Sequence, residues 1–246
     1  MKIFCDKSNI TKCSLLKNSI DIEKIDTNIE LHLKTDKIYI VNKNYKDPVK
    51  IIVDFNEKDF TEKMNMRLKD NKDIFRKVFS DKNSDILDGT AGFGRDGTLL
   101  NAMGHNVTMI ENSPIVSLLL NNGLERSDNK IRLFHGNVYD FLKHSKKRYD
   151  YIYLDFMFNK LKINSLSSKY DETLKLIAFI DDNKKEIVEI AKRYCKKKVI
   201  VKEPSNSISS LPKPNHIIKT KLISYNVYLS NDAWFTKYYF GYSGRW

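Results

Sequence analysis

The sequence predicts an α/β protein with a doubly wound, mostly parallel sheet, preceded by a small N-terminal α/β region. Two observations predict it. From residue 81 onward, short apolar runs alternate with amphipathic segments, which is the pattern of parallel strands joined by helical crossovers. A glycine-rich turn at residues 88–96 follows the first of these apolar runs, as in nucleotide-binding loops of such sheets. We therefore expect two units, residues 1–80 and residues 81–246.

The first unit is expected to combine strands with one long helix. The apolar runs at residues 38–41 and 51–55 are typical of strands. Residues 57–79 contain no Gly or Pro and are rich in Lys, Met, Arg and Leu, so a single helix is expected there. Its predicted core-facing residues are Phe60, Met64, Leu68, Phe75 and Phe79.

The second unit alternates strands and helices whose ends carry capping signals. Gly104 is expected to end the first helix, and Ser113 with Pro114 to begin the second. The parallel strands are expected at residues 86–87, 107–110, 131–134, 151–154 and 199–201. The helices are expected at residues 95–103, 114–124, 139–144 and 182–196. Three later strands, expected at one sheet edge, are predicted at residues 217–221, 225–229 and 235–240.

The composition favours a polyanionic partner and excludes some classes of protein. The formal charge is +12, from 43 basic and 31 acidic residues, which favours nucleic acid. Only eight of the basic residues are Arg, so a genome biased toward Lys, Asn and Ile is the alternative explanation. No apolar run reaches about 18 residues, so no membrane span is expected. The three cysteines are few and scattered, which predicts reduced thiols in a cytoplasmic protein without a metal site.

Polar clusters follow four of the predicted strands, at residues 88–96, 111–112, 136–138 and 155–158. The carboxyl ends of parallel strands are where doubly wound sheets bind their ligands. Glu111 ends the second strand, 23 residues after Asp88, where its carboxylate can accept hydrogen bonds from a ribose diol. That geometry serves both NAD and S-adenosylmethionine. The alternative is a surface glutamate that caps a loop.

Charges beside the glycine-rich loop distinguish the two ligands. Asp88 and Asp96 place two carboxylates there, which disfavours a pyrophosphate and favours the cationic amine and sulfonium of S-adenosylmethionine. Arg95 is expected to pair with the carboxylate of that ligand. The alternative for Asp96 is an acidic residue that stabilises the start of a helix.

The cluster at residues 155–158 is suited to a planar base that carries an exocyclic amine. The Asp155 carboxylate can accept an amine N–H while an aromatic ring stacks on the base, a contact worth about 1–3 kcal/mol. The alternative for Met157 and Phe158 is apolar packing beneath a loop.

These residues resemble the rRNA small subunit methyltransferase J family, class I enzymes that methylate the exocyclic amine of a guanine in 16S rRNA. The resemblance runs from about residue 51 to residue 204 and is densest at residues 87–96, Leu-Asp-Gly-Thr-Ala-Gly-Phe-Gly-Arg-Asp, beside the family's Asp-Ala-Thr-Ala-Gly-Leu-Gly-Arg-Asp. Residues 109–116 are similar to the next motif, Glu-Arg-Asn-Pro-Val-Val. The pair Gly123-Leu124 is also matched.

The resemblance implies a Rossmann-like class I methyltransferase with a mostly parallel seven-stranded sheet. It implies S-adenosylmethionine as cofactor and 16S rRNA or the small ribosomal subunit as partner. The implied cofactor-binding residues are Asp88, Gly89, Gly92, Gly94, Arg95, Asp96, Glu111, Asn112, Asn137, Val138 and Asp155. The implied catalytic residues are Asp155 and Phe158, and the implied substrate-binding residues are Phe156, Met157, Phe158 and Lys202.

The sequence also departs from the family's motifs. Residues 155–159, Asp-Phe-Met-Phe-Asn, lack both prolines of the family's Asp-Pro-Met-Phe-Pro, and Glu203 replaces a basic residue after Lys202. Proline would fix the backbone angle φ and direct the next carbonyl. Two alternatives follow: a methyltransferase that uses another substrate, or a catalytically degenerate protein that binds RNA or assists ribosome assembly. A nicotinamide-dependent oxidoreductase is disfavoured, because no further residues point to hydride transfer.

Overall fold

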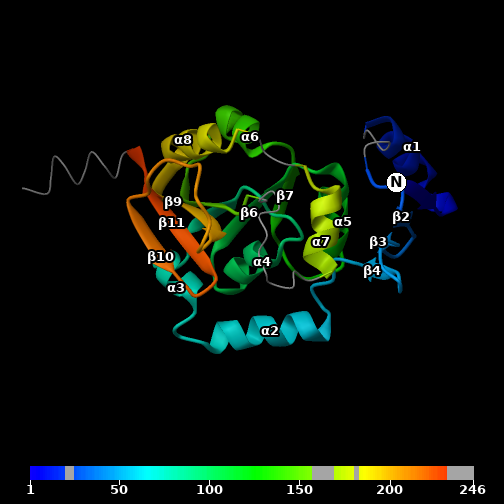
Figure 1. The fold of residues 1–246 in the computed structure, drawn as a ribbon, viewed down its shortest axis with the longest axis horizontal. Helices are drawn as coiled ribbons and strands as arrows, with labels where there is room; N and C mark the ends of the chain where they lie inside the picture. Colours follow the sequence, from blue (N-terminus) through cyan, green and yellow to red (C-terminus); the bar gives the residue numbers. More distant parts are fainter. Residues whose placement is uncertain (20–24, 157–168, 180–182, 232–246) are drawn as a thin grey trace, which may run out of the picture.

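The computed structural model describes residues 1–19, 25–156, 169–179 and 183–231, and its larger sheet has seven strands in the order β10-β11-β9-β8-β5-β6-β7 (Figure 1). The strands are β5 (Asp85–Asp88), β6 (Asn106–Glu111), β7 (Arg132–His135), β8 (Tyr149–Leu154), β9 (Cys195–Pro204), β10 (His216–Lys219) and β11 (Ile223–Leu229). Strands β5 to β9 are parallel, and β11 is antiparallel to both β9 and β10. The predicted doubly wound, mostly parallel sheet is confirmed.

Helices cover both faces of this sheet. They are α4 (Arg95–Ala102), α5 (Pro114–Glu125), α6 (Val138–His144), α7 (Lys169–Ile177) and α8 (Lys184–Tyr194). Helices α6 and α8 lie together on one face, where apolar residues such as Leu142 and Ile187 pack against Leu87 and Ile152. Because the chain passes from β5 to β6 and β7, and then returns to the other side of β5 at β8, the strand order reverses between β5 and β8. Ligand sites are expected at such a reversal.

The helix expected at residues 57–79 is divided into α2 (Lys58–Lys69) and α3 (Ile74–Val78). The Asp73 carboxylate accepts the backbone N–H of Phe75 at 2.9 Å and pairs with Arg67, so it caps a new helix although no Gly or Pro interrupts the sequence. Phe75 and Phe79 are buried as predicted. The other three residues, Phe60, Met64 and Leu68, are partly buried against the same core. The expected strand at residues 235–240 lies outside the described residues.

A second, four-stranded sheet is built from the N-terminal residues, in the order β1-β2-β3-β4. Its elements are β1 (Lys2–Cys5), the 3-10 helix η1 (Lys7–Asn9), α1 (Ile10–Ser19), β2 (Ile29–Leu33), β3 (Ile38–Asn42) and β4 (Val49–Ile51). Strand β1 is parallel to β2, and the other pairs are antiparallel. The N-terminal α/β region therefore has a regular sheet, of which the sequence indicated only part. The division of the chain at residue 80 stays a prediction.

The cysteines differ from expectation. Cys5 of β1 and Cys13 of α1 form a disulfide, so the expectation of reduced thiols is wrong for this pair. Cys195 is free and buried, and burial raises the pKa of its thiol to about 12. The spacing of Cys5 and Cys13 carried no signal, because strand β1 and helix α1 were not predicted.

The four-stranded sheet is joined to the larger unit by hydrogen bonds. The backbone N–H of Ile38 donates to Asn122 of α5 at 2.8 Å, and the Asn42 amide donates to Thr173 of α7 at 2.8 Å. The Tyr170 hydroxyl of α7 donates to the carbonyl of Ile52 at 2.9 Å. Helices α5 and α7 therefore hold the N-terminal sheet against the larger unit, beside them in Figure 1.

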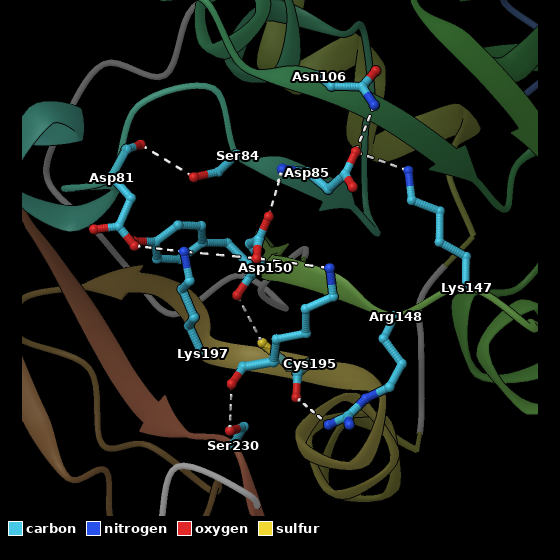
Figure 2. A network of polar contacts seen from close by, with 12 residues as sticks. Asp81, Ser84, Asp85, Asn106, Lys147, Arg148, Asp150, Cys195, Lys197 and Ser230 are labelled. Carbon is cyan, nitrogen blue, oxygen red and sulfur yellow. Dashed lines mark hydrogen bonds and ion pairs between the residues drawn. The ribbon is translucent and has the colours of Figure 1, made fainter.

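A network of hydrogen bonds and ion pairs links the amino ends of the central strands (Figure 2). The backbone N–H of Asp85 donates to Asp150 at 2.9 Å, and Lys147 donates to the Asp85 carboxylate at 2.9 Å. Lys197 pairs with Asp81 at 2.8 Å in the same view. Parallel strands place these amino ends at the edge opposite their carboxyl ends, so this network stabilises the sheet away from the predicted ligand site. Among the described residues, no helix is long and apolar enough to cross a membrane.

Candidate functional site

The glycine-rich loop joins β5 to α4. Its glycines let the backbone turn sharply and let neighbouring side chains pack closely against it. Gly92 and Gly94 have positive φ angles of 55° and 76°, which residues with a Cβ rarely adopt. A Cβ at Gly94 would lie 2.5 Å from a methyl group of Leu120. A Cβ at Gly89 would lie 2.7 Å from Val138. Gly94 provides no side-chain cap for α4, so a ligand at this end of the helix could use its first backbone N–H groups.

Glu111 organises this loop from the end of β6. Its side chain is buried, and its two carboxylate oxygens accept the backbone N–H groups of Gly92 at 2.8 Å and Ser113 at 2.7 Å. It therefore caps backbone groups, as the alternative reading held, but from a buried position and not at the surface. Each carboxylate oxygen has a second lone pair, so these bonds leave acceptor capacity for a ribose diol.

Asp88 lies beneath the loop, between β5 and α4. It is 1% exposed, accepts the backbone N–H of Thr90 at 3.3 Å, and would lie 2.9 Å from a Cβ at Gly97. Burial, together with the negative charge of Asp96, raises the pKa of Asp88 well above its usual range. Asp88 is thus a buried carboxyl beneath the loop and not an exposed charge beside it. The carboxylates that remain near the strand ends to attract a cationic ligand are those of Asp96, Glu111 and Asp155.

Asp96, in the first turn of α4, is held by three side chains from other elements. It accepts hydrogen bonds from the Tyr153 hydroxyl at 2.7 Å and from Lys202 at 2.9 Å, and Arg67 lies 4.0 Å away. Burial raises the pKa of Asp96, but the Lys202 charge and the Tyr153 hydrogen bond outweigh it, so the net pKa is below the usual value. Asp96 is thus an ionised group near the strand ends and more than a helix-start acid.

Asp155 follows β8 and shares Lys202 with Asp96. Lys202 donates to the Asp155 carboxylate at 2.7 Å, and the backbone N–H of Asp155 donates to the Thr90 hydroxyl at 2.6 Å. Burial raises the pKa of Asp155; Lys202 opposes this, Asp96 adds to it, and the net pKa is above its usual value. The two carboxylates raise the pKa of Lys202 against the effect of burial, so its ammonium stays charged.

The remaining predicted site residues lie around this centre. Arg95 is exposed, with its guanidinium 4.9 Å from the ring centroid of Tyr170, and Asn112 directly follows Glu111 in a half-buried position. Asn137 caps α6 by accepting the backbone N–H of Tyr139 at 2.8 Å. Val138 is buried against Gly89.

Of the residues predicted to bind substrate, Phe156 and Lys202 are described. Phe156 is 1% exposed, and its ring lies in the apolar core on the α8 side of the sheet. Its ring therefore faces the core and is not open to stack on a base. Met157 and Phe158 lie outside the described residues.

The sequence interpretation missed three contributors to the site. They are Tyr153, Arg67 and Thr90. The Tyr153 hydroxyl donates to Asp96, and the Thr90 hydroxyl accepts the backbone N–H of Asp155. For Tyr153 a signal existed. It precedes Asp155 by two residues, and residues two apart along a strand point to the same face of the sheet. Arg67 reaches Asp96 from a helix 29 residues earlier, and no local pattern marks it.

Lys202→Met is expected to destabilise the fold by about 1–3 kcal/mol near neutral pH, because two partly buried carboxylates would lose their shared cation. Urea unfolding measures this change. In the wild type, the pKa of Asp96 is lowered, so its stabilisation is present above its unfolded pKa and is lost as the pH falls through the lowered folded pKa.

The pH dependence separates this ion pairing from simple packing. Without Lys202, burial would raise the pKa of both carboxyls, so the destabilisation should grow as the pH rises and shrink as it falls. The stability gap between wild type and variant should therefore be smaller at about pH 5 than at about pH 7.5. Lys185→Met, at an exposed position on α8, is the control and should show no such dependence. An equal gap at both pH values would contradict the prediction.

The arrangement suits an organic ligand more than a metal. Among residues 1–19, 25–156, 169–179 and 183–231, no three His, Cys, Asp or Glu side chains gather to hold a metal ion. Asp96 and Asp155 instead share an ammonium group, and Glu111 is bonded to backbone N–H groups. The donor set therefore fits a ribose and cationic groups better than a pyrophosphate.

Comparison with known proteins agrees with this geometry. Residues 15–230 match a family described as "Putative SAM-dependent methyltransferase", where SAM is S-adenosylmethionine. Ribosomal RNA small subunit methyltransferase J from Buchnera aphidicola is 35% identical over 175 residues, which cover 65% of this chain and 70% of that protein. The protein of the same name from Coxiella burnetii is 34% identical over 153 residues, covering 58% of this chain and 60% of that protein.

A solved structure has the same fold. The crystal structure of a SAM-dependent methyltransferase from Neisseria gonorrhoeae superposes with a TM-score of 0.66 at 21% sequence identity, covering 94% of this chain and 96% of that one. At this identity the likeness is evidence for the Rossmann-like fold alone.

Proposed function

This chain belongs to the family of SAM-dependent methyltransferases, and on that premise we propose that it methylates the exocyclic N2 amine of a guanine in 16S rRNA. The observation that carries the proposal is that Asp155 and Asp96 share the Lys202 ammonium, at the point where the strand order reverses and beside the loop held by Glu111. The relatives' shared name supplies the substrate class. On this proposal the partners are small ribosomal subunits and their rRNA, and the protein acts in the cytoplasm.

The residues around the loop fit S-adenosylmethionine. We propose that Glu111 and Asn112 hold its ribose, that Asn137 and Val138 border its adenine, and that Arg95 and Asp96 contact its methionyl part. When bound, S-adenosylmethionine supplies an electrophilic methyl group. The glycines and Asp88 shape the loop, with Asp88 acting from beneath it.

Asp155 is proposed to act on the guanine amine. Its carboxylate would accept an N–H of the amine and orient the nitrogen lone pair toward the methyl donor. It would take up the proton released as the N–methyl bond forms and the methyl–sulfur bond breaks, which would leave S-adenosylhomocysteine. Its raised pKa suits a proton acceptor better than an ordinary surface aspartate. The Phe156 backbone carbonyl is a second acceptor for the amine, and Met157 with Phe158 are proposed to stack on the base.

The test is methyl transfer to isolated small ribosomal subunits. Purified protein, labelled S-adenosylmethionine and subunits from cells that lack the protein should give labelled 16S rRNA. Mass spectrometry of its nucleosides should identify N2-methylguanosine. Label on another nucleoside would mean that the methyl acceptor is not the guanine N2 amine. An unlabelled rRNA, with labelling of free metabolites or proteins only, would overturn the proposal.

A second candidate is the same chemistry on a different acceptor. It is favoured by the missing prolines around Asp155, because Phe156 and Asn159 leave that backbone less restricted than in the family motif. Parallel assays on free nucleosides and on a protein extract distinguish the two. If this protein binds S-adenosylmethionine and RNA tightly but transfers no methyl group, it is the catalytically degenerate RNA-binding protein of the third alternative.

A further inference from the structure

The outer face of the four-stranded sheet carries a row of stacked rings. Alternate residues of β2, such as Leu31 and Leu33, are buried on the inner face, and His32 points to the other face. Phe4 of β1 is the register partner of His32, and Tyr39 of β3 is the partner on its other side. The ring centroids of Phe4 and His32, and of His32 and Tyr39, are each 4.8 Å apart, with interplanar angles of 12° and 5°.

The two ends of this ring stack differ. At the Tyr39 end, the Lys50 ammonium lies 4.0 Å from the ring centroid. At the other end, Phe4 lies on the edge strand β1 and is 42% exposed. Cross-strand stacking stabilises a sheet, but it does not account for a phenylalanine left open at the edge. The stack can therefore be extended by one more planar ring, at Phe4.

Lysines surround the stack. Lys2, two residues before Phe4 on the same face, is exposed, and so is Lys50. Within the described part of the chain, neither forms an ion pair. Glu30 lies opposite Lys2 in the strand register on this face, where it is paired with Lys43 and contacts His32 at 3.3 Å. The face thus presents two exposed lysines beside an exposed aromatic ring, and the Glu30 carboxylate on it is already paired with Lys43. Aromatic stacking with flanking cations is how proteins bind single-stranded nucleic acid.

We propose that this face binds a single-stranded segment of the RNA substrate, with one base stacked on the open face of Phe4 and with Lys2 and Lys50 near its phosphates. The inference deepens the proposed function, on which it rests, by giving the N-terminal sheet a role in holding substrate. The sheet is suited to that role because α7 joins it to the candidate site. Tyr170 of α7 bonds the Ile52 carbonyl and packs against the Arg95 guanidinium.

The first test measures RNA affinity by fluorescence anisotropy, with a labelled single-stranded RNA of about ten nucleotides and the full-length protein. Phe4→Ala should weaken binding by about 5- to 150-fold, the loss of one base–aromatic stack. Phe4→Leu, which keeps apolar bulk without a ring, should weaken binding similarly. Phe4→Tyr, which keeps the ring, should bind RNA as the wild type does. Phe134→Ala, at a phenylalanine of the other sheet that is 45% exposed, is the matched control.

The salt dependence tests the lysines. Lys2→Ala and Lys50→Ala should each reduce the slope of log affinity against log salt by about 0.7, the value for one phosphate contact on a single strand. Unchanged affinity in Phe4→Ala and Phe4→Leu, equal to that of Phe134→Ala, would overturn the inference. Because binding is read without methyl transfer, Phe4-dependent binding without rRNA methylation would defeat only the proposed function. Methylation with Phe4-independent binding would defeat only this inference.

Discussion

Glu111→Ala is expected to weaken the binding of S-adenosylmethionine by at least about 100-fold, which corresponds to about 2.7 kcal/mol. A ribose diol would donate two hydrogen bonds to the proposed acceptor, and bonds to a charged group contribute about 1.5–3 kcal/mol each. The variant would also leave the backbone N–H groups of Gly92 and Ser113 without their acceptor. Both effects should lower the affinity for S-adenosylmethionine, because Gly92 belongs to the loop that is proposed to contact it.

Isothermal titration calorimetry of the purified variants measures this loss. Glu111→Gln keeps one acceptor oxygen and the shape of the side chain, so its affinity should fall between those of the wild type and the alanine variant. Glu125→Ala, at an exposed position on α5, is the control for a lost negative charge and should bind as the wild type does. Equal affinities of Glu111→Ala and Glu125→Ala would remove Glu111 from the cofactor site.

The parts of the fold that local chemistry determines could be predicted from the sequence. Ser113 accepts a backbone N–H at the start of α5, Gly104 has a φ of 95° just after α4, and β5 to β9 lie within a few residues of their expected positions. Each of these depends on neighbours along the chain. The grouping of Asp96, Glu111 and Asp155 at one sheet edge also followed, because parallel strands bring their carboxyl ends together.

What could not be predicted depends on distant partners. The pairing of β1 with β2 joins segments 28 residues apart in register, and no local pattern signals it. The expected contact of Lys202 with substrate stays a prediction. Its position between two carboxylates from different elements could not be predicted from the sequence. Burial likewise raises the pKa of Asp88, and burial is a property of the whole fold. The sequence shows which groups are present, and their protonation depends on contacts it does not show.

Asp155→Ala is expected to lower kcat for methyl transfer by about 10²–10³-fold, the usual cost of removing a positioned proton acceptor. The cofactor should still bind, because Glu111 and the glycine-rich loop are unchanged. The fold should persist too, because Lys202 keeps its ion pair with Asp96 at 2.9 Å. Asp140→Ala, at an exposed position of α6, controls for the loss of one carboxylate and should retain full activity.

The pH profile distinguishes a proton acceptor from a structural role. Only ionised Asp155 can take up the amine proton, so the wild-type rate should fall as the pH drops through the Asp155 pKa. Because burial raises that pKa, the fall should begin above the usual aspartate value of about 3.9. Asp155→Asn keeps an acceptor oxygen but cannot take up a proton under these conditions, so its low residual rate should lack this acid limb. An acid limb that persists unchanged in Asp155→Asn would assign the proton to another group.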